Sequence, residues 1–352
     1  MTNRRVSFVF PQQPTDPRAI LPYGELVRDS PFHALWMGQS LRIETHPALA
    51  YLAGAGCHIP VGVSVALTAL RHPYDAAIQA RSLAALTDRP VSVGYGAADA
   101  AFVTSLNGRP YDKPAAAVEE YVSVMRALLS GERVRHKGRL FELDCTLPPL
   151  AHAPLEIGAG VLRPAMARAA GRVAESAMTW LTPPAYLSTT VIPQLAAGAA
   201  QAGRDRPPRV VAMVPVGLSG PGRNPMLLAQ NTVLNHMRKA HYTDMLRRAG
   251  LDVDRSDPVA GARELVDEGV FVYGKPGDVA AEIRKYHDVG VDEVVLNVTG
   301  ISNLYGDAAL LDDLHALAAE LGGEAGAAES LEAAESSEAA EHSEAAEGGR
   351  SR

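Results

Sequence analysis

The sequence has few of the residues that hold metals or disulfides, and it has no long apolar run. Cys57 and Cys145 are its two cysteines, and they form neither a metal-binding spacing nor a disulfide framework. We therefore expect no metal site and a reducing, cytoplasmic location. No apolar run is long enough to span a bilayer, and the one before Pro11 is too short for a signal peptide. These absences argue against a membrane protein or a disulfide-rich secreted protein.

The formal net charge of −7 is concentrated at the C-terminus. Residues 322–352 hold eight Glu and two Arg, which contribute −6 and leave about −1 for the rest. A near-neutral body without a basic stripe argues against nucleic acid as a partner. The repeated Ser/Glu/Ala units of the tail contain one Leu and no aromatic residue, too little apolar surface to offset ordering entropy. We predict one folded domain, 1–321, followed by a disordered acidic tail, 322–352.

Eight short apolar runs alternate with Ala/Leu-rich stretches of helical spacing. The runs lie at 5–10, 33–38, 59–67, 90–95, 154–159, 174–181, 209–218 and 293–299. Most are continuous, as expected for parallel strands covered on both faces. The pattern predicts a single (β/α)8 TIM barrel. A doubly wound sheet is the alternative, but it usually carries a glycine fingerprint after the first strand, where this sequence reads PQQP.

Two connections are too long for plain barrel loops, so we predict insertions after strands 4 and 7. The first contains GERVRHKGRLFEL, which indicates a hairpin around Lys137 and Gly138. The second, 219–292, contains NTVLNHMRKAHYTDMLRRAG, a basic amphipathic helix by its pattern. Insertions of this kind supply active-site lids in barrels.

The carboxyl ends of the predicted strands, where barrel enzymes keep their chemistry, are poor in acids, bases and metal ligands. They carry glycine, small polar groups and apolar or aromatic surface instead. Such a mouth suits a flat ring system whose own chemistry supplies the reactivity. The stretch Gly158-Ala159-Gly160 leads from a strand into a helix, which suits close backbone approach to a ligand or an anion at the helix start. Tight packing geometry is the alternative reason for these glycines.

Four stretches carry a resemblance to a known family. They are VGVSVALTALRHPYDAAIQARSLAAL; VSVGYG with the later EEYVSVMRALLSGERVRHKGRLFEL; EIGAGVLRPAMARAAGRVAESAMTW; and YGKPGDVAAEIRKYHDVGVDEVVLNV. In this order they resemble the bacterial luciferase-like superfamily of flavin- and deazaflavin-dependent oxidoreductases. The resemblance implies reduced coenzyme F-420 (a deazaflavin) or FMN as cofactor, a small-molecule or peptide substrate, and often a homodimer. It also implies a cis peptide between Ser64 and Val65.

The resemblance implies a set of cofactor-binding positions at the mouth. These are Ser64, Val65, Tyr95, Gly96, Gly158, Ala159, Gly160, Val161, Thr179 and Trp180. Alcohol-oxidising relatives place Asp-His after the second strand, where this sequence has Gln39 and Ser40. Neither residue can act as a base unaided, which speaks against oxidation of a hydroxyl. We take Gln39, Ser40 and His46 as the candidate catalytic residues, with a structural role at the start of a helix as the alternative for His46.

These observations favour a reductase that transfers hydride from reduced F-420 to an activated double bond. The stretches GQSLRIETH and GAGVLRPAMARAAGR resemble a subgroup of bacterial natural-product pathways, in which dehydroalanine of a ribosomally made, lanthipeptide-type peptide is the most concrete substrate. An FMN-dependent monooxygenase is the first alternative. A non-catalytic flavin-binding paralogue is the second, because the Asp-His pair is missing.

Overall fold

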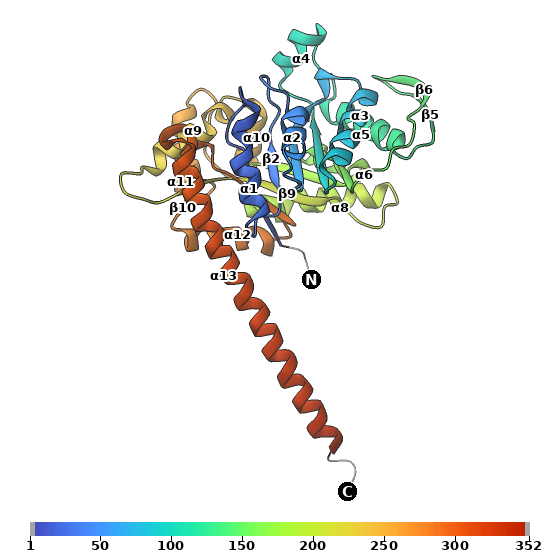
Figure 1. The fold of residues 1–352 in the computed structure, drawn as a ribbon. Helices are drawn as coiled ribbons and strands as arrows, with labels where there is room; N and C mark the ends of the chain where they lie inside the picture. The colour runs from blue at the N-terminus through green and yellow to red at the C-terminus, as the bar shows by residue number, and fades with distance from the viewer. Residues whose placement is uncertain (1–3, 349–352) are drawn as a thin grey trace.

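A closed barrel of eight parallel strands forms the centre of the protein, and helices surround it (Figure 1). The computed structural model describes residues 4–348, and the side chains of 4–323. The barrel strands are β1 (Arg5–Val9), β2 (Leu35–Met37), β3 (Val61–Leu67), β4 (Val91–Gly96), β7 (Leu155–Gly160), β8 (Ser176–Trp180), β9 (Arg209–Leu218) and β11 (Glu293–Asn297). Each strand pairs with the next, and β11 closes the barrel on β1. The predicted (β/α)8 fold is confirmed, and the doubly wound alternative is wrong.

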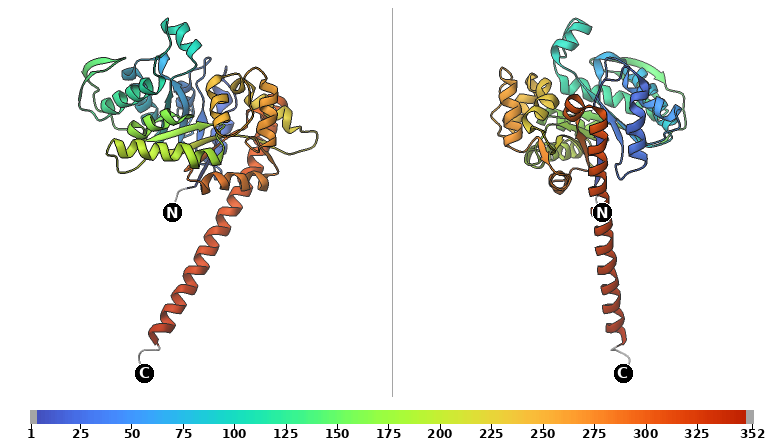
Figure 2. Two further views of the ribbon diagram at one scale, coloured as in Figure 1. Left: turned by 180° about the vertical axis from the view of Figure 1, so that it is seen from behind. Right: turned by 60° about the vertical axis from the view of Figure 1, so that its left-hand side comes forward.

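The helices between the strands pack around the outside of the barrel (Figure 2). They include α1 (Leu21–Arg28), α2 (Thr45–Gly54), α3 (Pro73–Thr87), α6 (Pro164–Val173), α8 (Ile192–Gln201) and α12 (Pro276–Asp288). Several start on proline, at the first helical turn, where the missing amide proton has no helical partner to lose. None of the helices in the described part of the chain is long and apolar enough to cross a membrane.

Both predicted insertions are present. The first, between β4 and β7, holds α4 (Ala100–Asn107), α5 (Pro114–Leu129) and the antiparallel hairpin of β5 (Arg133–Lys137) and β6 (Glu142–Thr146). The hairpin confirms the prediction from GERVRHKGRLFEL. The carboxylate of Glu120 on α5 fastens the hairpin turn, because it accepts the backbone N–H groups of Leu140 and Phe141 at 3.0 Å each.

The second insertion, between β9 and β11, holds α9 (Pro225–Met237), α10 (Ala240–Arg248), α11 (Pro258–Asp267) and the short strand β10 (Val272–Gly274). The single helix predicted over 231–250 is wrong. The chain leaves the helical conformation at Lys239 (φ −102°, ψ 122°), whose ammonium pairs with Asp99 at 3.3 Å. The break turns Tyr242 against the ring of His236, with centroids 4.9 Å apart.

The last helix, α13 (Thr299–Gly348), starts beside the barrel and then projects away from it in all three views (Figures 1 and 2). It is interrupted at Gly306, where φ is +83°. The helix continues through 322–348, which differs from the disorder that we predicted for 322–352. Alanine and glutamate are strong helix formers, so a segment rich in them can be helical without a core to pack against. Residues 349–352 lie outside the described residues.

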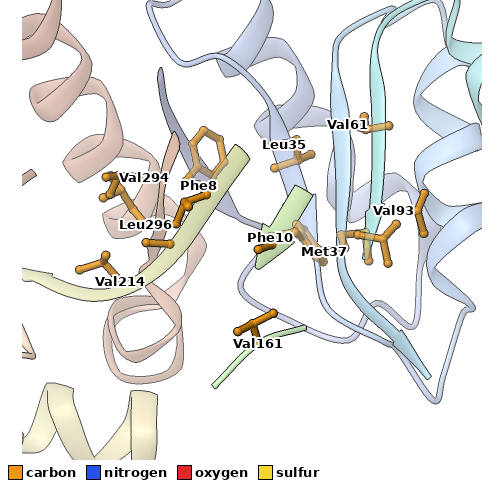
Figure 3. Packing of buried hydrophobic residues seen from close by; sticks show 14 of the residues in the cluster. Phe8, Phe10, Leu35, Met37, Val61, Val93, Val161, Val214, Val294 and Leu296 are labelled. Atoms are coloured by element: carbon orange, nitrogen blue, oxygen red, sulfur yellow. The ribbon is translucent and has the colours of Figure 1, made fainter. Parts of the chain in front are cut away.

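Two apolar layers and one polar layer fill the barrel region. The larger cluster lies between strands and helices, where Phe8, Leu35 and Leu296 pack together (Figure 3). A smaller cluster fills the interior with Trp36, Met178, Val211, Met213 and Val295 among others.

Beneath the interior cluster lies a buried polar network. The carboxylate of Glu293 accepts hydrogen bonds from Ser7 Oγ and Trp36 Nε1, both at 2.7 Å, and pairs with Arg209 at 2.8 Å. The barrel interior is therefore a packed core, and its chemistry is confined to the mouth at the carboxyl ends of the strands.

Candidate active site at the barrel mouth

Trp180 links opposite sides of the mouth. It ends β8, packs on the interior apolar cluster and is half-buried. Its Nε1 donates to Ser64 Oγ of β3 at 3.0 Å. Above it, the ring of His236 from α9 stacks at 5.4 Å between centroids and 20° between planes. The mouth therefore has an aromatic wall beside the hydroxyl of Ser64, positioned by β3, β8 and the second insertion.

Strand β3 is irregular where it reaches this wall. Its pairing with β4 shifts register between Val63 and Ala66, and the Ser64–Val65 peptide is cis, as the resemblance implies. The side chain of Val65 turns toward glycines of β4 and β7. A Cβ on Gly96 would lie 2.7 Å from Val65 Cγ2, and one on Gly160 would lie 3.2 Å from Val65 Cγ1. These glycines make room for Val65.

Gly158 also serves packing. A Cβ there would meet Ser176 Oγ at 2.5 Å and the backbone oxygen of Ser176 at 2.8 Å. Protein atoms therefore fill the space that we proposed for a ligand beside the Gly158 backbone. The alternative reading of Gly158-Ala159-Gly160, tight packing geometry, accounts for Gly158 and Gly160.

Four predicted cofactor contacts have side chains that point away from the mouth. Tyr95 is fully buried against Tyr121 of α5, with ring centroids 5.2 Å apart. Ala159 and Val161 belong to the apolar layer between barrel and helices. Thr179 lies between two residues of β8 that face the interior, so its side chain faces the helices. Side-chain contacts to a cofactor are therefore not supported at these positions.

Gln39 and Ser40 lie at the rim and are held by local hydrogen bonds. Gln39 Nε2 donates to the backbone oxygen of Ser40 at 2.9 Å, and its Oε1 accepts from the N–H of Leu67 at 3.4 Å. Ser40 is buried, and its Oγ accepts from the N–H of Arg42 at 3.1 Å. That bond uses a lone pair of Ser40 and leaves its O–H group as a donor. Gln39 fixes the loop, and Ser40 has a proton to offer.

Beside this loop, the carboxylate of Glu44 contacts His46 and Arg71. The sequence does not predict a role for Glu44. Its carboxylate accepts from the N–H of His46 at 2.8 Å, pairs with Arg71 at 2.9 Å and lies 3.3 Å from His46 Nδ1. Burial alone would raise the pKa of Glu44, but the hydrogen bonds and charges of His46 and Arg71 outweigh it and lower the pKa to about 2. Glu44 is therefore a fixed anion and does not exchange protons near neutral pH.

His46 is buried at the start of α2, and its Nε2 has no hydrogen-bond partner within the described part of the chain. His236 is also unsatisfied at Nδ1. Burial, with His241 nearby, lowers the pKa of His236 to about 4, so this ring is neutral at pH 7. Of the two histidines, His46 is a candidate predicted from the sequence; the structure places His236 on the wall and His46 behind the rim.

The rim also carries positive charge near a helix start. Helix α6 has no side-chain cap, and its N-cap residue is Arg163, 3.5 Å from Asp244 of α10. Uncapped N–H groups and the helix dipole attract anions at such a position. Among the residues with described positions, no group of three His, Cys, Asp or Glu side chains could hold a metal ion.

Comparison with known families gives a match over most of the chain. The description "Luciferase-like monooxygenase" fits residues 6–293. The chain belongs to the luciferase-like monooxygenase family. A relative of this luciferase-like chain is the 5,10-methylenetetrahydromethanopterin reductase of Methanolobus tindarius. It is 26% identical over 306 residues, which cover 80% of this chain and 91% of the relative.

Solved structures that superpose on this chain include a dehydrogenase and a monooxygenase. An F-420-dependent secondary alcohol dehydrogenase, solved with an F-420–acetone adduct, superposes with a TM-score of 0.68 at 18% identity, over 87% of this chain and 98% of that one. A monooxygenase from Streptomyces bottropensis gives 0.64 at 16% identity, over 91% and 99%. At such identities the superpositions show a common fold.

Proposed function

We propose that this luciferase-like protein is a reductase that uses reduced coenzyme F-420 to transfer hydride to an activated double bond. The observation that carries the proposal is the pair of neutral residues, Gln39 and Ser40, at the rim. Neither can remove a proton at neutral pH, and the pKa values of Glu44, about 2, and His236, about 4, make both of these weak bases. Oxidation of an alcohol needs a group that removes the hydroxyl proton, whereas reduction of an activated double bond needs a modest proton donor.

The residues of the mouth fit a flat, anionic cofactor. A ring system bound there would lie against the half-buried face of Trp180 and near the unsatisfied Nδ1 of His236. Its phosphate or carboxylate groups would suit the uncapped start of α6 and Arg163. When bound, the reduced deazaflavin supplies the hydride. Two names support this cofactor: the alcohol dehydrogenase structure is F-420-dependent, and so is a glucose-6-phosphate dehydrogenase relative from Microbacterium testaceum, 27% identical over 206 residues.

In this scheme Ser40 holds the proton. Its hydroxyl donates a hydrogen bond to the developing negative charge on the substrate or relays a proton from water. Gln39 acts indirectly, because its Nε2 fixes the backbone of Ser40. Donors preorganised in this way are worth roughly 10²–10³ in rate. The substrate that we propose first is dehydroalanine in a ribosomally made, lanthipeptide-type peptide, whose double bond is activated by the adjacent carbonyl.

The decisive experiment compares reduced F-420 and reduced FMN in parallel, first for binding and then for reduction of a dehydroalanine peptide under anaerobic conditions. We expect turnover with F-420. Ser40→Ala should lower turnover about a hundredfold with cofactor affinity intact. Ser130→Ala, which removes an exposed hydroxyl at the end of α5, is the matched control and should have no effect. Normal turnover in Ser40→Ala would refute the role of Ser40.

An FMN-dependent monooxygenase is the second candidate, favoured by the family description itself. It would show oxygen consumption with reduced FMN and none with F-420, because the deazaflavin has carbon in place of the reactive flavin nitrogen. Binding of both cofactors without reduction of any substrate would support a non-catalytic paralogue.

A further inference from the structure

A cleft lies at the opposite end of the barrel from the mouth, and the proposed reaction gives it no role. It has a volume of about 520 Å³ and lies where the chain enters four neighbouring parallel strands, β1 to β4. We call it the basic cleft, because its lining includes Arg4, Arg5, Arg28, Arg89, His33 and His58. No Asp or Glu is among the described residues that line it.

We propose that the basic cleft binds a small anion with two or more phosphate groups. Guanidinium groups present paired N–H donors that match phosphate oxygens, and arginine is the usual residue for this recognition. The volume exceeds that of a single phosphate ion and lies within the range of small-molecule sites. A diphosphate or triphosphate, alone or on a small molecule, fits both the charge and the size.

Arg4 and Arg28 of the basic cleft can exchange their present partners at little cost. Arg4 pairs with Asp288 and Arg28 with Asp29, and in both pairs about half of each side chain is exposed. Such exposed pairs contribute about 0–1 kcal/mol. Arg89 donates to the backbone oxygen of Asp88, and within the described residues no carboxylate lies in ion-pair distance of it. Its charge is therefore available to an anion.

The histidines add directed donors or acceptors. Ring atom Nδ1 of the exposed His58 lies 2.9 Å from the backbone oxygen of Thr87, which fixes the ring beside Arg89. Because the oxygen of Thr87 accepts, Nδ1 carries the proton of this contact, and Nε2 of His58 donates to a phosphate oxygen only from the doubly protonated ring. His33 precedes β2, where its backbone N–H donates to the oxygen of Val6 in β1 at 2.7 Å. The residues that line the cleft are thus held by the first residues of the barrel strands.

The basic cleft is separate from the mouth. The length of β3, residues Val61–Leu67, lies between them, about 20 Å at 3.3 Å per residue. The polar network around Glu293 and the apolar cluster fill the interior along this distance. Binding at the basic cleft therefore does not compete for the space of a cofactor at the mouth.

The test is calorimetric titration of the full chain with inorganic triphosphate at fixed ionic strength. We expect one site per chain. The double variant Arg89→Ala/His58→Ala should weaken binding roughly tenfold or more. Both residues are exposed, so a thermal melt should show an intact fold. Arg133→Ala removes the same charge from the distant β5–β6 hairpin and should bind like the wild type.

Three results would overturn the proposal. The first is no triphosphate binding by the wild type. The second is an equal loss in Arg133→Ala and in the cleft variant, which would indicate general attraction to positive charge. The third is displacement of triphosphate by coenzyme F-420, which would place the anion at the mouth. The titration uses no turnover, so its outcome is independent of the proposed reductase activity.

Discussion

Replacing Glu44 by Gln tests whether the contacts of this carboxylate with His46 and Arg71 stabilise the fold. The substitution keeps the shape of the side chain and removes its charge. The carboxylate caps α2 through the N–H of His46 and pairs with Arg71, whose side chain is 10% exposed. Glutamine can still accept one hydrogen bond, but Arg71 is left without its anion. We expect Glu44→Gln to lower the free energy of unfolding.

The lowered pKa of Glu44 sets the scale of this loss. A tenfold change in proton affinity corresponds to about 1.4 kcal/mol, so a fall in pKa from 4.5 to about 2 gives a ceiling of about 3.5 kcal/mol. The Glu44 side chain is 32% exposed, and solvent screening reduces that figure. The cap contributes about 1 kcal/mol and is partly kept by glutamine. We therefore expect a loss of about 1.5–2 kcal/mol at pH 7.

The loss should depend on pH in a defined direction. A carboxylate whose pKa is lowered by folding stabilises the protein above its unfolded pKa, near 4.5. That contribution falls as the pH drops toward the folded pKa, near 2. Glutamine does not titrate. The difference between wild type and variant should therefore be constant above about pH 6, and more than half of it should be gone by about pH 3.

Urea unfolding of both proteins at several pH values between 3 and 7 measures this difference. Asp29→Asn is the matched control, because Asp29 pairs with Arg28 in an exposed ion pair that should change stability by less than about 0.5 kcal/mol. A difference for Glu44→Gln that is below 0.5 kcal/mol, or that stays the same from pH 7 to pH 3, would refute the role of the half-buried Glu44 as a stabilising anion.

Three further predictions concern the mouth, the barrel packing and the tail. The sequence has two tryptophans, Trp36 inside the barrel and Trp180 at the mouth, so cofactor binding should quench tryptophan fluorescence in the wild type and far less in Trp180→Phe. Gly158→Ala should cost about 1–3 kcal/mol in chemical denaturation, because its Cβ meets fixed backbone, whereas Gly54→Ala meets nothing within 4 Å and should stabilise slightly. Deleting 323–352 should leave the melting temperature and cofactor affinity nearly unchanged, because that sequence has no apolar face; a loss of several degrees would contradict this.

The barrel could be predicted because its signal is local. Continuous apolar runs mark parallel strands covered on both faces, and proline marks helix starts. Because these runs are apolar throughout, they do not indicate whether a given side chain faces the barrel interior or the surrounding helices. In β4 both neighbours of Tyr95 are glycine, so no alternation of polarity shows that the ring points toward α5. The contact of Tyr95 with Tyr121 of α5 shows the direction of its side chain.

Other features depend on partners far apart in the sequence. The pairing of Glu44 with Arg71 spans 27 residues, and no short motif announces it. The break at Lys239 has neither glycine nor proline to mark it; the residues around it have adequate helix propensity, and tertiary contacts with Asp99 and Trp180 decide the outcome. The fold class followed from local patterns, whereas the details of the mouth followed from contacts between insertions.

Those contacts join the two insertions to each other beside the mouth. Asp99 caps α4 in the first insertion, and Lys239 lies between α9 and α10 in the second, so their ion pair joins the two insertions at the carboxyl end of the barrel. The pair is partly exposed, with 47% and 30% of the two side chains accessible, and an exposed pair contributes at most about 1 kcal/mol. Trp180 and Ser64 lie on barrel strands, which hold them in place. The ion pair of Asp99 and Lys239, in contrast, breaks at little cost. A ligand that breaks this ion pair would shift the insertions and leave the strands in place.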